Sequence, residues 1–151
     1  MYKVLFVCLG NICRSPMAEF IMKQMVEEQG IEKDFYIESC ATSSEELGNP
    51  VYLPARQVLE KRGINCSNKR ARKITLQDYE KFDYIVCMDG SNLRSLNRMF
   101  PNDNGKKIFK ILSFAGIDRD VADPWYTRDF SATEEDVCIG CKALIEYVLN
   151  N

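Results

Sequence analysis

The stretch Cys8-Leu9-Gly10-Asn11-Ile12-Cys13-Arg14-Ser15-Pro16 decides how the rest of the chain folds. Before it stands the apolar run Val4-Leu5-Phe6-Val7, which has the length and the β-branched and aromatic content of a buried strand. After it, Pro16 opens a segment whose apolar residues follow a helical spacing, and Ser15 is a residue type that caps helices. The stretch therefore predicts a strand, a tight loop and a helix N-terminus.

The predicted loop has the composition of a site for an oxyanion. Backbone N–H groups that converge at a helix N-terminus bind anions, and Gly10 and Asn11 tolerate the positive φ that a curled loop needs. Arg14 adds a planar fork of donors that matches two oxygens of a phosphate. Cys8 ends the strand, where the helix dipole and the guanidinium favour a thiolate. This arrangement predicts a nucleophile beneath an oxyanion; the alternative is a small buried cysteine that ends a strand.

Composition indicates a globular protein of one domain. The chain has 151 residues, of which 46% are hydrophobic and 28% are charged, and its net charge is −2; a chain of this length forms one core. The charge argues against general binding to nucleic acid or to a membrane. No apolar run approaches the roughly 20 residues of a membrane span. Since no signal-peptide pattern precedes the first strand, we expect a cytoplasmic protein.

Two residue counts restrict the chemistry. The seven cysteines, an odd number, fit free thiols in a reducing compartment. Histidine is absent, which excludes Ser-His-Asp and Cys-His catalysis and histidine-based metal sites. A cysteine enzyme of this composition must therefore activate its thiol by charges and dipoles. We expect it to use no metal and no cofactor.

Strand and helix patterns alternate along the whole chain, which predicts a parallel sheet covered by helices on both faces. Ligands bind at the carboxyl ends of the strands in such sheets, and the Cys8 loop lies there. The basic stretch 69–73 is interpreted as a solvated loop, with a patch for acidic partners as the alternative. The expected strands are 3–7, 35–40, 84–88 and 107–112, and the expected helices are 16–29, 54–62, a short one capped by Thr75, 91–99 capped by Ser91, and a terminal one capped by Thr133.

Three motifs together resemble the low-molecular-weight protein tyrosine phosphatase family. They are Cys8-x5-Arg14-Ser15 near the N-terminus, residues 82–89 (FDYIVCMD) followed by residues 91–94 (SNLR), and Asp123-Pro124-Trp125-Tyr126. The resemblance covers nearly the whole chain. It implies one phosphatase domain over residues 1–151, with an α/β fold in which a four-stranded parallel sheet of flavodoxin-like winding has helices on both faces.

The resemblance also implies a reaction. Cys8 would attack the phosphorus of a phosphate monoester and form a cysteinyl-phosphate, while Arg14 and loop N–H groups hold the oxygens. Asp123 would protonate the leaving phenol and later activate water. The implied partners are phosphotyrosine proteins, with small aryl phosphates as further substrates, and we expect a monomer with weak self-association as the alternative. The implied phosphate-binding loop consists of Leu9, Gly10, Asn11, Ile12, Cys13 and Ser15.

The resemblance also implies supporting roles for residues farther along the chain. The resemblance implies that Trp125 and Tyr126 wall the substrate pocket and that Ser39 supports the loop. Asn68 falls where many members of the family have a histidine that joins the same hydrogen-bond network, so we expect Asn68 there, as a donor that cannot carry charge. Cys13, five residues after the nucleophile, indicates a reversible disulfide that would protect it from irreversible oxidation.

Two other functions fit part of the pattern. An arsenate reductase uses a similar Cys-x5-Arg loop, but it needs two further cysteines as a relay; Cys87 is near the expected place, and residues 88–101 contain no cysteine. A phosphotyrosine-binding module without turnover would not need Cys8, Arg14 and Asp123 together. The sequence therefore predicts a phosphatase.

Overall fold

Four apolar segments form one parallel sheet with the strand order β2-β1-β3-β4. In the computed structural model, which describes residues 1–151, strand β1 (Tyr2–Cys8) lies between β2 (Phe35–Ala41) and β3 (Tyr84–Cys87), and β4 (Ile108–Lys110) forms an edge. Every residue of the run 4–7 is fully buried. Burial on both faces of the sheet accounts for an apolar run without polar alternation. The predicted four-stranded parallel sheet is confirmed.

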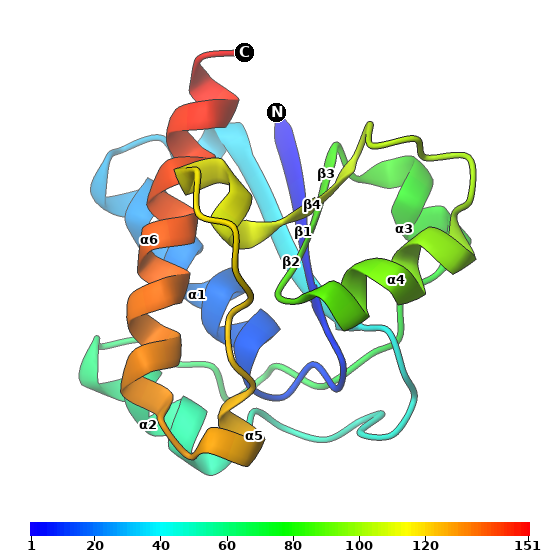
Figure 1. The fold of residues 1–151 in the computed structure, drawn as a ribbon. Helices are drawn as coiled ribbons and strands as arrows, with labels where there is room; N and C mark the ends of the chain where they lie inside the picture. The colour runs from blue at the N-terminus through cyan, green and yellow to red at the C-terminus, as the bar shows by residue number, and fades with distance from the viewer.

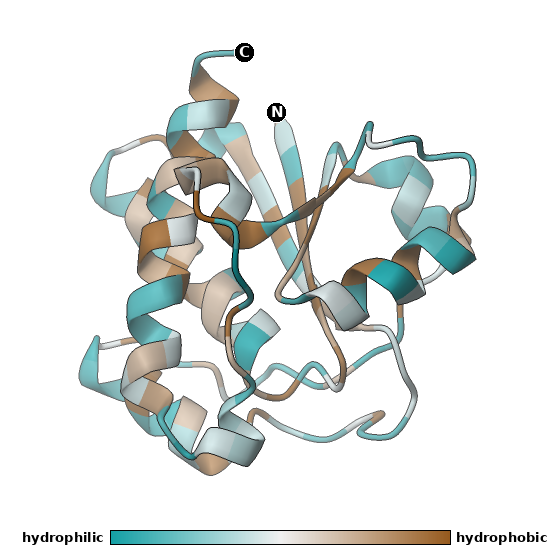
Figure 2. Cartoon of the chain, viewed as in Figure 1, coloured by the Kyte–Doolittle hydropathy of each residue, from teal (hydrophilic) through white to brown (hydrophobic).

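Helices cover both faces of this sheet (Figure 1). Helices α1 (Arg14–Glu28), α2 (Leu53–Lys61) and α6 (Phe130–Leu149) lie on one side, and α3 (Leu76–Lys81) and α4 (Gly90–Met99) on the other. Alternate residues of β1 therefore serve two cores: Val4 and Phe6 join the cluster beneath α1 and α6, whereas Leu5 and Val7 join the cluster beneath α3 and α4. Figure 2 shows the hydrophobic residues concentrated on the strands between these layers.

The strand register brings three loops to one edge of the sheet. Cys8 pairs with Ala41, and Val7 pairs with Cys87. The loops that follow β1, β2 and β3 therefore leave the sheet side by side, near the short helix α5 (Pro124–Thr127) in the lower part of Figure 1. This edge is where the sequence predicts a ligand site.

The helix boundaries depart from the sequence-based prediction where an aspartate caps the helix. Helix α4 is capped by Asp89, whose carboxylate accepts the Asn92 N–H at 2.7 Å, so Ser91 lies inside the first turn. Helix α6 begins four residues earlier than expected because Asp129, and not Thr133, is its cap. The predicted Thr75 cap of α3 is confirmed. A serine or threonine inside the first turn is an equally good cap by type, so composition alone chooses the wrong residue.

The predicted strand 107–112 is shorter in the structure, and two 3-10 helices were not predicted. The last strand ends at Lys110, after which residues 111–115 form a 3-10 helix, η2 (Ile111–Ala115), and a second 3-10 helix, η1 (Glu32–Asp34), precedes β2. The basic stretch 69–73 is a loop, as predicted, but it is not fully solvated, because Lys69 and Arg72 point into ion pairs. None of the helices is both long enough and apolar enough to span a bilayer.

Candidate active site

The loop between β1 and α1 curls around the sulfur of Cys8. Asn11 adopts a φ of 61°, and its backbone N–H donates to Cys8 Sγ at 3.2 Å. Gly10 does not take a positive φ; instead, a Cβ at this position would lie 3.2 Å from Cγ of Glu46. The prediction of a left-handed residue is therefore confirmed for Asn11 and wrong for Gly10, which provides space for a neighbouring side chain.

Ser15 faces the sulfur instead of capping the helix. Helix α1 begins at Arg14, so Pro16 lies in the first turn, where its missing N–H leaves no helical hydrogen bond unmade. Ser15 Oγ then lies 3.0 Å from Cys8 Sγ. The predicted cap is wrong, since no side chain caps this helix.

Arg14 is held by groups from two other loops. Its Nη1 donates to Asp89 Oδ2 at 2.8 Å and to the carbonyl of Val121 at 2.9 Å, and its Nη2 lies 3.4 Å from Asp123 Oδ2. Burial acts to lower the pKa of Arg14, but negative charge on Cys8 and the two carboxylates outweigh it and raise the pKa. The guanidinium therefore stays charged although only 2% of Arg14 is exposed.

Asp123 lies just before helix α5 and lines the same pocket as Cys8. Its Oδ1 accepts the backbone N–H of Trp125 at 3.0 Å, which leaves Oδ2 directed at Arg14. The carboxyl is a quarter exposed. A carboxyl fixed by one oxygen and accessible through the other has the freedom to exchange a proton with a bound molecule.

The pocket at this edge of the sheet has a volume of about 240 Å³. Cys8 and Arg14 are buried and lie at its bottom, whereas Trp125 and Tyr126 are 45% and 76% exposed and lie at its mouth. Such a pocket suits a flat ring with an anionic end. No group of three or more acidic or cysteine side chains is arranged to hold a metal ion. The lining residues are Cys8, Leu9, Gly10, Ile12, Cys13, Arg14, Glu45, Glu46, Asp123, Trp125 and Tyr126.

Cys13 is the second thiol of this pocket. Burial, together with the negative charges of Cys8 and Asp123, raises the pKa of Cys13 to about 12. Cys13 is therefore a neutral thiol near neutral pH.

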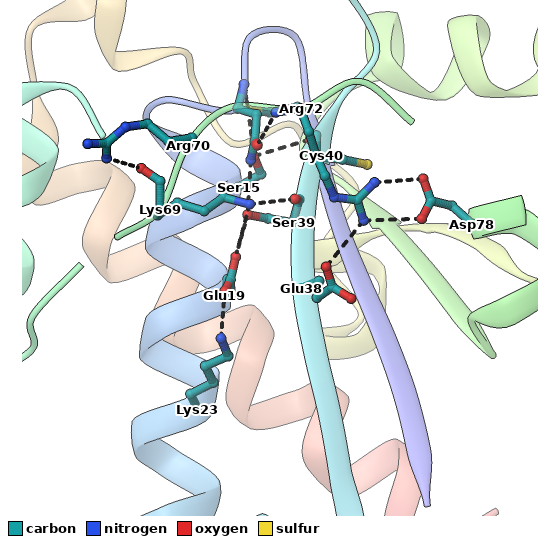
Figure 3. A network of polar contacts seen from close by, with 12 residues as sticks. Ser15, Glu19, Lys23, Glu38, Ser39, Cys40, Lys69, Arg70, Arg72 and Asp78 are labelled. Carbon is teal, nitrogen blue, oxygen red and sulfur yellow. Dashed lines mark hydrogen bonds and ion pairs between the residues drawn. The ribbon is translucent and has the colours of Figure 1, made fainter. Parts of the chain in front are cut away.

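A polar network beneath the loop includes one of the two predicted supporting residues. Ser39 is buried and accepts a hydrogen bond from Asn11 Nδ2 at 2.9 Å. Asn68 is exposed, and its side chain makes no hydrogen bond, so its expected place in the network is wrong. Lys69 turns inward instead and donates to the Ser39 carbonyl at 2.7 Å (Figure 3). Residues 66–69 form a turn in which the Lys69 N–H donates to the Cys66 carbonyl. In this turn the side chain of residue 69, and not that of residue 68, points inward.

Several residues of this site were not predicted from the sequence. Asp89 lies two residues after the end of β3, in a region where ligand-binding residues of parallel sheets gather, and that signal was available. Glu19 lies four residues after Ser15, on the same face of α1. Glu45 and Glu46 come from the loop after β2, and only the folded chain brings them to the pocket.

Comparison with known proteins finds relatives whose descriptions agree with one another. The family model described as low molecular weight phosphotyrosine protein phosphatase matches residues 3–151. The chain is 37% identical to the low molecular weight protein-tyrosine-phosphatase YfkJ of Bacillus subtilis, over 96% of this chain and 94% of that protein. It is 41% identical to the low molecular weight phosphotyrosine protein phosphatase of Gallus gallus, over 95% and 93% of the two chains.

Solved structures agree with these sequence relatives. The crystal structure of YfkJ superposes with a TM-score of 0.95 and 36% identity, over 99% of this chain and 96% of that one. The crystal structure of DARP, a drosophila arginine phosphatase, superposes with a TM-score of 0.88 and 33% identity, over 97% of each chain.

Proposed function

The chain belongs to the low molecular weight phosphotyrosine protein phosphatases, and from this we propose that it hydrolyses phosphotyrosine in proteins, and small aryl phosphates, through a cysteinyl-phosphate intermediate. One observation carries the proposal. The sulfur of Cys8 accepts the Asn11 N–H at 3.2 Å and lies 3.0 Å from the Ser15 hydroxyl oxygen, in the pocket that also holds Arg14 and Asp123. A thiol with these donors is prepared to act as a thiolate nucleophile.

In the first step the Cys8 thiolate attacks phosphorus. The S–P bond forms as the P–O bond to the phenol breaks, and the charge on the three equatorial oxygens meets the Arg14 guanidinium and the N–H groups of loop residues 9–15. Because Arg14 is already held by Asp89, little reorganisation is needed when the phosphoryl group arrives. No metal ion is needed for this charge stabilisation, since the guanidinium and the loop dipoles provide it.

The leaving group requires a proton. A phenol has a pKa of roughly 10, so the tyrosyl oxygen leaves poorly as an anion at neutral pH. Asp123, in its protonated form, gives its proton to this oxygen as the P–O bond breaks. In the second step the Asp123 carboxylate takes a proton from water, the water oxygen bonds to phosphorus, and the S–P bond breaks. Ser15 then donates to the departing thiolate.

The shape of the pocket supports tyrosine over serine as the phosphorylated residue. The sulfur lies at the bottom, where Cys8 is 3% exposed, and the aromatic rings of Trp125 and Tyr126 form the mouth. A phosphorylated phenyl ring is long enough to reach the sulfur and presents its faces to these rings. A phosphoserine side chain is too short to do both.

Phosphoarginine is the second substrate class that an observation favours. Two carboxylates, Glu45 and Glu46, line the pocket and would attract the guanidino group of such a substrate. One structural relative is a drosophila arginine phosphatase. We rank it second because Leu9, Ile12 and the two aromatic rings make much of the wall apolar.

Arsenate reduction receives less support. Cys87, the cysteine nearest to the expected relay position, does not line the pocket. Burial and the charge of Asp89 raise the pKa of Cys87 to about 12. A buried neutral thiol away from the pocket is a poor relay for a disulfide.

The test is hydrolysis of an aryl phosphate with a chelator present. We expect turnover by the wild type, none by Cys8→Ser, and a loss of about 10²-fold or more in Asp123→Asn, the size of general acid catalysis. Rapid quenching in acid should trap 32P on Cys8 from a labelled substrate. Parallel assays with phosphotyrosine and phosphoarginine peptides decide between the two substrate classes. Folded, reduced wild-type protein without turnover on either class would contradict the proposal.

A further inference from the structure

A chain of hydrogen bonds leads from the Cys8 sulfur to a buried carboxylate. Ser15 Oγ lies 3.0 Å from Cys8 Sγ, and Asn11 Nδ2 donates to Ser15 Oγ at 2.8 Å. The same amide nitrogen donates to Ser39 Oγ at 2.9 Å, and Ser39 Oγ donates to Glu19 Oε1 at 2.6 Å. All five residues are buried. The chain therefore links the nucleophile to helix α1 and to strand β2.

An ion pair ends this chain (Figure 3). Lys69 Nζ lies 3.5 Å from Glu19 Oε1 and donates to the Ser39 carbonyl at 2.7 Å. A second ammonium, on Lys23, lies 2.6 Å from Glu19 Oε2, but its side chain is 44% exposed whereas that of Lys69 is 11% exposed. Burial lowers the pKa of Lys69, and the charge of Glu19 acts against this shift. The buried carboxylate of Glu19 therefore has one buried ammonium partner, Lys69, and one largely exposed partner, Lys23, in a site where an unpaired charge would be costly.

The chemistry of each member sets the direction of the hydrogen bonds. An ionised carboxylate only accepts, so the single hydroxyl hydrogen of Ser39 must point at Glu19. Ser39 Oγ can then only accept from Asn11, whose amide nitrogen donates. The Asn11 amide is held in the same orientation from its other side, because Oδ1 accepts the Arg72 N–H at 3.2 Å.

The direction of these hydrogen bonds decides where the hydroxyl hydrogen of Ser15 points. Its oxygen accepts from Asn11, so its own hydrogen is available to an acceptor. Two acceptors are within reach: Cys8 Sγ at 3.0 Å and the Cys40 carbonyl at 3.4 Å. The sulfur is nearer, and as a thiolate it is the stronger acceptor. The hydrogen of Ser15 therefore points at the nucleophile.

We propose that Glu19 and Lys69 are positioning residues that fix the direction of this hydrogen-bonded chain and thereby keep the Ser15 hydroxyl donating to the Cys8 sulfur. The inference rests on the proposed function of Cys8 as the nucleophile. Neither residue touches the substrate. Without the carboxylate, the Ser39 hydroxyl has no fixed acceptor, the Asn11 amide keeps only the Arg72 N–H as a fixed contact on its other side, and the Ser15 hydroxyl is less firmly directed at the thiolate.

The experiment measures Cys8 directly by its rate of alkylation with iodoacetamide across pH, followed by peptide mapping, together with kcat and KM on an aryl phosphate. Glu19→Gln keeps the shape but places an amide donor opposite Ser39. We expect its alkylation rate at about pH 6 and its kcat to fall about tenfold, as for loss of one hydrogen bond to a charged group, with KM within about twofold. Lys69→Met should change both in the same direction.

Two further variants separate positioning from general packing. Lys69→Arg keeps the charge and should restore alkylation and kcat to within about threefold of the wild type. Lys23→Met removes the exposed partner of the same carboxylate and should stay within about twofold, since exposed ion pairs contribute little. The inference would be overturned if both Glu19→Gln and Lys69→Met were alkylated at the wild-type rate. It would also be overturned if Lys69→Arg had an alkylation rate and a kcat no higher than those of Lys69→Met.

Ser39→Ala covers the case in which Glu19→Gln does not fold. It breaks the chain without changing the charges, so it should slow alkylation, and adding Lys69→Met to it should have no further effect. A full additional loss in the double variant would contradict the proposed route. Alkylation of Cys8 requires no turnover. A wild type that is alkylated at Cys8 but does not hydrolyse phosphate esters would refute the proposed function, while the alkylation rates of the variants would still test this inference.

Discussion

Arg14 Nη1 donates to Asp89 Oδ2 across 2.8 Å, although the two residues are 75 positions apart. The other carboxylate oxygen of Asp89 accepts the Asn92 N–H at 2.7 Å and caps helix α4. One side chain thus ties the loop after β1 to the helix after β3. The guanidinium is oriented by this contact before any phosphate reaches it.

Asp89→Asn should weaken catalysis with little effect on the fold. Asparagine caps helices as well as aspartate does, but its amide nitrogen would face Arg14 and repel its donors. We expect kcat/KM on an aryl phosphate to fall about tenfold to a hundredfold, as for loss of a hydrogen bond between charged groups. Asp120→Asn is the matched control, because Asp120 accepts the Gly90 N–H at the same helix end but makes no contact with Arg14. Equal losses in both variants would contradict this assignment.

Asp123→Asn should affect substrates according to their leaving groups. Phenyl phosphate releases a phenol with a pKa of roughly 10 and needs the proton of Asp123, whereas nitrophenyl phosphate releases a much more acidic phenol. Steady-state kinetics should therefore show a larger loss with phenyl phosphate. Asp129→Asn, which changes the cap of α6 outside the pocket, is the control. The same factor on both substrates would argue against a general acid at this position.

The disulfide between Cys8 and Cys13 should form slowly near neutral pH. Peroxide first oxidises the Cys8 thiolate to a sulfenic acid with loss of hydroxide; the Cys13 thiolate then attacks that sulfur, the S–O bond breaks, and the oxygen leaves as hydroxide, which takes a proton from solvent. Because the pKa of Cys13 is raised to about 12, its thiolate fraction should rise about tenfold for each pH unit below that value. Mass spectrometry after peroxide treatment should show faster disulfide formation at higher pH. A pH-independent rate would contradict it, and Cys13→Ser should show none.

Asp78→Asn should destabilise the protein in a pH-dependent manner. Burial acts to raise the pKa of Asp78, but hydrogen bonds from Arg72 and Thr75 outweigh it and lower the pKa. A lowered pKa in the folded state means that the contribution is present above the unfolded value of about 3.9 and is lost as pH falls through the folded value. We expect denaturant unfolding to show a loss of about 1–2 kcal/mol at neutral pH, shrinking below about pH 4. Glu80→Gln on the exposed side of the same helix should show neither effect.

Gly140→Ala should destabilise helix α6 despite the better helix propensity of alanine. A Cβ at this position would lie 2.5 Å from Cγ1 of Ile111 in η2, closer than packed atoms approach. Alanine gains about 1 kcal/mol in propensity, and overpacking costs about 1–3 kcal/mol. We expect a net loss in the free energy of unfolding. Adding Ile111→Ala should not add its full cost, since it removes Cγ1 and Cδ1 and relieves the contact; simple additivity of the two losses would count against this explanation.

Local sequence determined much of the fold. The apolar run of β1, the Thr75 cap and the alternation of strands and helices predict a parallel sheet covered on both faces, and the structure has it. The strands and helices follow from the spacing of apolar residues close in the chain, whereas only Thr75 among the predicted caps is found at its helix end. The same reasoning placed Cys8 and Arg14 in one loop, and the resemblance added Asp123.

Only the tertiary structure decided which residues hold that loop in place. Asp89 lies 2.8 Å from Arg14, and Glu19 lies 3.5 Å from Lys69 and accepts the Ser39 hydroxyl. Neither contact follows from spacing, because each joins elements that the sheet register brings together. The exchange of Asn68 for Lys69 has the same origin: a turn sets which of two neighbouring side chains points inward. The sequence alone thus determined the candidate reacting groups, and the packing of distant segments decided their support, because buried charges must find partners wherever the fold provides them.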